Sequence, residues 1–198
     1  RQGDFVMPGI DSSFMWQGYI SQQENPHQIN PARGFVSSAN QLPTDTKYPY
    51  YLGGSYPLYR GLSINRNLSA MKNISIADMQ ALQTNNYDVF AAIARPVLLK
   101  YLNINELNTE EQACVSILTS WGLNDDVFEK GPIIFETWWD NLEEYVWQDE
   151  LAQSKLPLLQ PDESTLLEGI IKDSNYIFVD NIQTPQKEAL RQQVTNSF

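Results

Sequence analysis

The chain has 198 residues, of which 42% are hydrophobic and 19% charged, a balance typical of a folded globular protein. Its net charge of −11 argues against a nucleic acid partner, because a phosphate-binding surface needs clustered Lys and Arg. No apolar run approaches the ~20 residues of a membrane-spanning helix, so we expect no membrane partner either.

Residues 1–74 are predicted to form a loop-rich segment. Gly, Pro, Ser and Asn recur throughout it, and the Pro and Gly residues up to Pro57 leave no room for a long helix. Apolar runs at residues 14–20 and 34–36 favour two short strands. The rest of the segment is typical of ordered loop.

Residues 75–198 are predicted to form a helical domain whose first helix begins at Ser75. Ser75 and Asp78 form a capping-box pattern, and residues with helical spacing follow from Met79 to Val97. Pro96 is expected to kink or break this helix near its end.

Further helix signals follow in chain order. Thr109 opens a capping pattern before an apolar face that ends at Gly122, and Pro132 fits the first turn of a third helix. We expect a short helix at residues 163–171 and a last one that opens at Thr184-Pro185. Because 18 of the 24 acidic residues lie after residue 103, this helical domain is expected to have a solvated acidic surface.

Few residues have catalytic or metal-binding potential on their own. His27 lies in a polar loop without a nucleophile motif or an evident carboxylate partner, so we interpret it as a surface residue. Cys114, the only Cys, lies on an apolar helix face, which predicts a buried inert thiol and excludes an internal disulfide. One His and one Cys cannot form a zinc site unaided. Asp125 and Asp126 are expected in a solvated turn.

Five Tyr residues gather in one loop: Tyr48, Tyr50, Tyr51, Tyr56 and Tyr59. Such a loop can line a pocket for aromatic or acyl groups, or its rings can simply pack within a segment that lacks regular structure. Composition does not favour the pocket over the packing. Trp138 and Trp139 lie among large apolar residues at helical spacing, and they are predicted core residues.

A longer set of motifs follows one order along the chain. A Trp-x-Gly-x-Ile run at residues 16–20 leads through two Asn-Pro pairs to Ser38-Ala39-Asn40-Gln41. Tyr48-Pro49, Arg60, Ile64-Asn65-Arg66, the segment 75–83 and the Gly-Pro-Ile-Ile-Phe-Glu run at residues 131–136 come next. In this order the motifs resemble those of the penicillin acylase (penicillin amidase) family of N-terminal-nucleophile hydrolases, over most of residues 8–145.

The resemblance implies an amide hydrolase. In this family a Ser at the start of the β subunit attacks the amide carbonyl with its own α-amino group as base. Asn40 matches the family's Asn in the oxyanion hole, and its uncharged amide is a hydrogen-bond donor at every working pH. Arg60 matches the family's Arg near the nucleophile, where it supports the site. On the residues alone, Asn40 would be a turn residue and Arg60 a surface charge.

The resemblance also sets expectations for the whole protein. Position 1 is Arg rather than Ser, so we expect an internal fragment of the β subunit that is inactive alone. The expected fold is mainly α: a loop-rich region with short strands, then a helical segment, excised from an αββα hydrolase. The expected partners are the remainder of the β subunit, the α subunit and a small acyl amide, either a β-lactam side chain or an N-acyl homoserine lactone.

Three further expectations rest on the resemblance or on alternatives to it. No cofactor or metal is expected in this chain, whereas calcium is an option for the full-length parent. Family habit indicates a bacterial enzyme in the periplasm or secreted. The alternatives are a non-catalytic ligand-binding module that uses the Tyr-rich loop 48–59, and a degenerate relative that acts as a scaffold.

Overall fold

The computed structural model describes residues 6–54, 56–154 and 159–198. The chain divides into two compact units, Arg1–Asn85 and Asn86–Phe198.

The described residues are mainly helical, as the sequence predicted. The single-turn helices are η1 (Ser12–Phe14), η2 (Gln22–Glu24), η3 (Ile104–Glu106) and η4 (Ile177–Val179). The α-helices are α1 (Tyr59–Ala70), α2 (Ile76–Gln83), α3 (Val89–Tyr101), α4 (Thr109–Ser120), α5 (Gly131–Gln153), α6 (Glu163–Lys172) and α7 (Leu190–Asn196). Within the described ranges, β pairing is limited to an isolated bridge between Tyr87 and Asn124.

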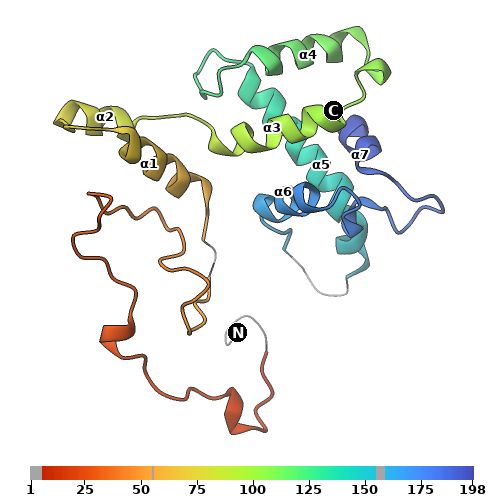
Figure 1. Ribbon diagram of the computed structural model, residues 1–198. Helices are drawn as coiled ribbons and strands as arrows, with labels where there is room; N and C mark the ends of the chain where they lie inside the picture. The colour runs from red at the N-terminus through yellow and green to blue at the C-terminus, as the bar shows by residue number, and fades with distance from the viewer. Residues whose placement is uncertain (1–5, 55, 155–158) are drawn as a thin grey trace. The chain divides into compact units, whose positions relative to one another are not determined.

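The first unit begins with a long loop, and the two strands expected in it do not form. Residues 14–20 and 34–36 have no strand conformation (Figure 1). Trp16 and Tyr19 are 81% and 96% exposed, so the apolar run has no buried face that would select a strand. Gly18 has a φ of 146°, outside the range of a regular strand.

The helices of the first unit correct the sequence predictions in two places. Residues 59–70 were predicted as part of the loop-rich segment, but they form α1, which begins two residues after Pro57. The capping box of Ser75 and Asp78 is confirmed at the start of α2. However, the single helix expected to reach Val97 is wrong. It ends at Gln83, and α3 begins anew because the side chain of Asp88 accepts a hydrogen bond from Ala91 N at 2.8 Å.

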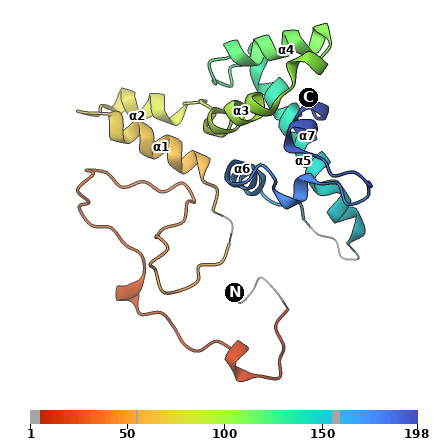
Figure 2. The ribbon, with the colours of Figure 1, turned by 45° about the vertical axis from the view of Figure 1, so that its right-hand side comes forward.

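The second unit is built around α5. Its buried side chains include Phe135, Trp138, Trp139, Leu142, Val146 and Trp147. Figures 1 and 2 show α4 near the start of α5, with α6 farther along it. Phe90 of α3 packs edge-on against Trp139 at a ring-centroid distance of 4.7 Å. The predicted core role of the two Trp residues therefore agrees with their burial, and Pro132 stands in the first turn of α5 as expected.

Two helix starts in the second unit differ from those predicted. Asn108 rather than Thr109 caps α4, because its side chain accepts from Glu110 N and Glu111 N while Glu111 completes the capping box. The last helix begins at Leu190 rather than at Thr184. The Thr184 hydroxyl instead donates to Gln186 O at 2.8 Å, which holds a turn there. The helix predicted at 163–171 is present as α6.

Candidate functional site

Asn40 lies at the tip of a tight turn in the first unit. Its φ is 61°, in the left-handed region that Asn tolerates better than most residues. Ala39, the residue before it, is buried, whereas Asn40 itself is exposed. The turn therefore anchors the main chain and leaves the side-chain amide of Asn40 accessible.

Arg60 projects from the first turn of α1 to this amide. Its Nη2 donates a hydrogen bond to Asn40 Oδ1. A guanidinium has only donors, so the Asn40 atom that faces it must be the carbonyl oxygen. The contact fixes the orientation of the amide and leaves the Nδ2 donors of Asn40 for another acceptor.

Asn65, one turn farther along α1, holds the segment that precedes Asn40. Its Oδ1 accepts from Ser37 Oγ at 2.9 Å and from Arg33 Nη1 at 2.8 Å. Its Nδ2 donates to Gly61 O at 2.7 Å, within the helix. The loop is thus fastened to α1 at two places, by Asn65 and by Arg60.

A cavity of about 630 Å³ lies beside Arg60 in the same unit. Its apolar wall includes Ile64, Leu68, Ile76 and Met79, and Ser63 adds a hydroxyl. Its size falls in the range of small-molecule sites, and mostly apolar walls with a few polar groups are typical of them.

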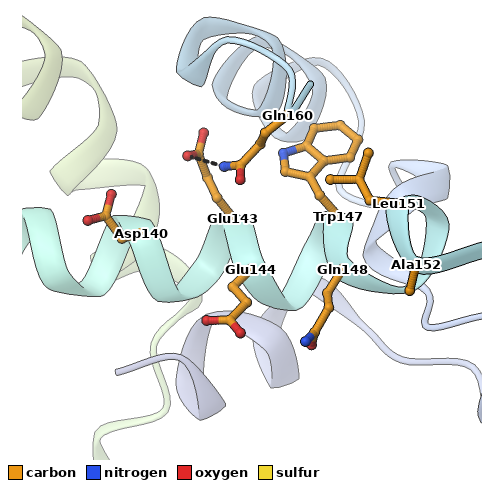
Figure 3. Close-up of a pocket in the computed structure, with 8 residues that line it drawn as sticks. All are labelled: Asp140, Glu143, Glu144, Trp147, Gln148, Leu151, Ala152 and Gln160. Atoms are coloured by element: carbon orange, nitrogen blue, oxygen red, sulfur yellow. Dashed lines mark hydrogen bonds between the residues drawn. The ribbon is translucent and has the colours of Figure 1, made fainter. Parts of the chain in front are cut away.

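A second cavity, of about 510 Å³, lies against α5 in the second unit (Figure 3). Glu143 points from α5 toward Gln160, whose Nε2 donates to Glu143 Oε2 at 2.8 Å. Asp140 and Glu144 also line the hollow, and Trp147 supplies an aromatic wall. Burial raises the pKa of Glu143, and the bond from Gln160 offsets part of that rise.

The other candidates from the sequence do not meet at either place. The exposed His27 ring has Nδ1 2.8 Å from Asn25 O, and Cys114 is half-buried in α4. Asp125 and Asp126 are exposed before α5, as expected, and Asp126 Oδ1 accepts from Asn86 Nδ2. Across the described ranges, no group of three or more His, Cys, Asp and Glu could hold a metal ion.

The Tyr-rich loop makes contacts within itself and with Glu24. Tyr48 and Tyr50 pack edge to face with ring centroids 5.6 Å apart. Tyr50 Oη donates to Glu24 Oε1 at 2.9 Å, and Tyr56 Oη donates to Gly53 O at 3.0 Å. These contacts hold part of the loop together, whereas Tyr51 is 53% exposed.

The structure thus brings Asn40 and Arg60 into contact and leaves the amide N–H groups of Asn40 as uncharged donors. The family model for penicillin amidase matches residues 1–198, so the chain belongs to the penicillin amidase family. No solved structure gives a significant match. None of the helices described in the structure combines the length and apolar character needed to cross a membrane.

Sequence reasoning named Asn40 and Arg60 but gave no role to the residues that hold them. Gln41, Gly61 and Asn65 surround the Asn40 turn. Of these three residues, only Gly61 had a local sequence signal for close packing, because Gly is unfavourable inside a helix unless close packing requires it.

Proposed function

We propose that this chain is part of an enzyme that hydrolyses acyl amides, with Asn40 as a donor in the oxyanion hole. The observation that carries the proposal is the bond from Arg60 to Asn40 Oδ1. It orients the amide before any substrate arrives, and a donor that needs no reorganisation is most effective for a developing negative charge.

In this mechanism a Ser nucleophile elsewhere in the parent enzyme attacks the amide carbonyl. The carbonyl oxygen becomes negatively charged in the tetrahedral intermediate, and Asn40 Nδ2 donates to it. Collapse of the intermediate expels the amine, and water then hydrolyses the acyl-enzyme. Arg60 does not touch the substrate in this scheme. It fixes Asn40, and its charge favours the oxyanion from a distance.

The cavity beside Arg60 supports a substrate with an apolar portion, because aliphatic side chains make up much of its wall. Both proposed substrate classes meet this condition: β-lactams with an apolar side chain and acyl homoserine lactones. The remaining β subunit and the α subunit would complete the site, in an enzyme of the bacterial periplasm or a secreted one. Calcium remains a prediction for the parent alone.

The test is hydrolysis of a chromogenic phenylacetyl amide by the full-length parent and its variants. Asn40→Ala should lower kcat by about 10²–10³, the usual effect of losing one oxyanion donor. Asn40→Asp should lose at least as much, because it keeps an acceptor for Arg60 but replaces the donor with negative charge. The 198-residue chain alone should show no turnover.

The matched control is Asn73→Ala. Asn73 is also exposed and left-handed, with a φ of 53°, so Ala causes similar backbone strain there. The Asn73→Ala variant should have the kcat of the parent. Activity of Asn40→Ala close to that of the parent, or turnover by the short chain, would overturn the proposal.

A further inference from the structure

Gln41 closes the Asn40 turn with both ends of its side-chain amide. Its Oε1 accepts from Ala39 N at 2.5 Å, and its Nε2 donates to Ser37 O at 3.1 Å. The side chain therefore joins main-chain groups before Asn40 to the residue after it. Such side-chain to main-chain bonds substitute for the main-chain pairing that a loop lacks.

The same side chain is seated on α1. A Cβ at Gly61 would lie 3.1 Å from Gln41 Cβ, which is closer than ordinary contact, and 3.4 Å from Gln41 Oε1. Gly61 is buried and follows Arg60 directly. Two consecutive residues of α1 thus lie against the turn: Arg60 bonds to the Asn40 amide, and Gly61 leaves room for Gln41.

The backbone of Asn40 gives this contact a functional consequence. A φ of 61° is uncommon even for Asn, so the contacts around Asn40 help to keep it in the left-handed region. Loss of the Gln41 bonds would free the turn, and the Asn40 amide would then move with it. A misplacement of about 1 Å can lower a rate by 10²-fold.

We propose that Gln41 is a positioning residue that holds the Asn40 amide in its donating orientation. Gln41 does not touch the substrate, and its effect passes through the main chain of Ala39 and Ser37. This inference rests on the proposed function, since it matters only if Asn40 is the oxyanion donor.

The experiment compares Gln41→Met with the full-length parent, because Met keeps the length of the side chain and removes both hydrogen bonds. We expect kcat to fall by about ten- to a hundredfold with KM little changed, the pattern for an interaction made in the transition state. The control is Gln17→Met. Gln17 Nε2 likewise donates to two main-chain carbonyls, of Ser12 and Met15, in the same loop. It should keep the kcat of the parent.

A double-mutant cycle separates positioning from a general loss of structure. In the Asn40→Ala background, Gln41→Met should cause no further fall in kcat, because the group that it positions is gone. Equal losses in both backgrounds, or an unchanged kcat in Gln41→Met, would overturn the inference while leaving Asn40 as the donor. An active Asn40→Ala variant would overturn the proposed function itself, and the inference with it.

Gly61→Ala provides a second test if Gln41→Met does not fold. Ala favours the helix more than Gly does, so α1 itself is not weakened. Its Cβ would nevertheless require Gln41 to shift by a few tenths of an ångström. We expect a fall in kcat in the same direction, again absent in the Asn40→Ala background. A Gly61→Ala enzyme with the kcat of the parent would contradict the proposed seating of Gln41.

Discussion

At Gly131, the first residue of α5, the neighbouring side chain of Trp121 leaves no room for a Cβ. A Cβ at this position would lie 2.2 Å from Trp121 Cγ and 2.6 Å from Trp121 Cβ. Trp121 is 3% exposed, and its Nε1 donates to Asn124 O at 2.8 Å, so it has little freedom to move. Close packing of this kind makes added atoms costly.

Gly131→Ala should therefore lower the free energy of unfolding by about 1–3 kcal/mol, the usual range for overpacking. Urea unfolding followed by Trp fluorescence measures it. Gly122→Ala is the control, because the nearest atom to its Cβ would be 4.0 Å away, on Asn124. That variant should stay within about 0.5 kcal/mol of the parent, as is common at exposed sites. Equal stability of the two variants would contradict the argument.

Among single residues, the sequence led to Asn40 and Arg60 only through the order of family motifs around them. Their contact could not be read from it, because the two residues are 20 positions apart and meet through the packing of a loop on α1. The same holds for Gln41. Its local bonds are short in sequence, but its role depends on Gly61, which tertiary contact brings to it.

At the scale of elements, a side chain from another helix caps the C-terminal end of α4. Arg95 of α3 donates from Nη1 to Leu118 O and to Trp121 O, each at 2.8 Å. Its guanidinium also lies 5.7 Å from the centre of the Trp121 ring. The last carbonyls of a helix have no partner within it, so a cation there both bonds them and matches the helix dipole.

Arg95→Met should lower the free energy of unfolding by about 2–3 kcal/mol, since a hydrogen bond to a charged group contributes about 1.5–3 kcal/mol and both bonds come from the same nitrogen, Nη1. Thermal and urea unfolding measure the change. Arg191→Met, at an exposed position of α7, is the matched control and should be close to neutral. An Arg95→Met protein as stable as this control would show that the two bonds contribute little.

The elements themselves were predicted where the signal is local. The capping box at Ser75, the Pro in the first turn of α5 and the helix α6 all depend on a few adjacent residues. The strands at 14–20 and 34–36 failed because a strand needs a partner or a buried face, and an apolar run specifies neither. The helix expected at Thr184 failed for a different reason: local side-chain bonds favour a turn there.

At the scale of the whole chain, the acidic surplus of the second unit affects folding. Burial and then the neighbouring carboxylates of Asp162 and Glu143 raise the pKa of Glu163 from 4.5 to about 7. Burial, with the neighbouring Asp149, raises the pKa of Glu150 to about 7 as well. Each group binds its proton more tightly in the folded state than in the unfolded state.

These raised pKa values determine the direction in which stability changes with pH. A carboxyl with a raised pKa stabilises the fold below its unfolded value of 4.5, and that contribution is lost as the pH rises to about 7. The melting temperature should therefore be higher at about pH 5.5 than at about pH 8. Solvent screens part of this effect at Glu163, because the residue is exposed.

Glu163→Gln should raise the melting temperature at about pH 8 and reduce its change toward about pH 5.5, because Gln carries no charge at either pH. Glu168→Gln, at another exposed position of the same helix, is the control and should alter the pH dependence less. Scanning calorimetry at the two pH values measures both variants. If the melting temperature of Glu163→Gln changes with pH as much as that of the parent, groups other than Glu163 cause the pH dependence.

The sequence by itself determined the mainly helical character, several helix starts and the membership of the penicillin amidase family. These properties depend on composition, on spacing within one or two turns, and on motifs in a fixed order. The tertiary structure decided the rest: the contact of Arg60 with Asn40, the seat of Gln41 on Gly61, and the burial that shifts the acidic groups. Those depend on which distant segments pack together, and pairwise packing is not encoded in any short stretch of sequence.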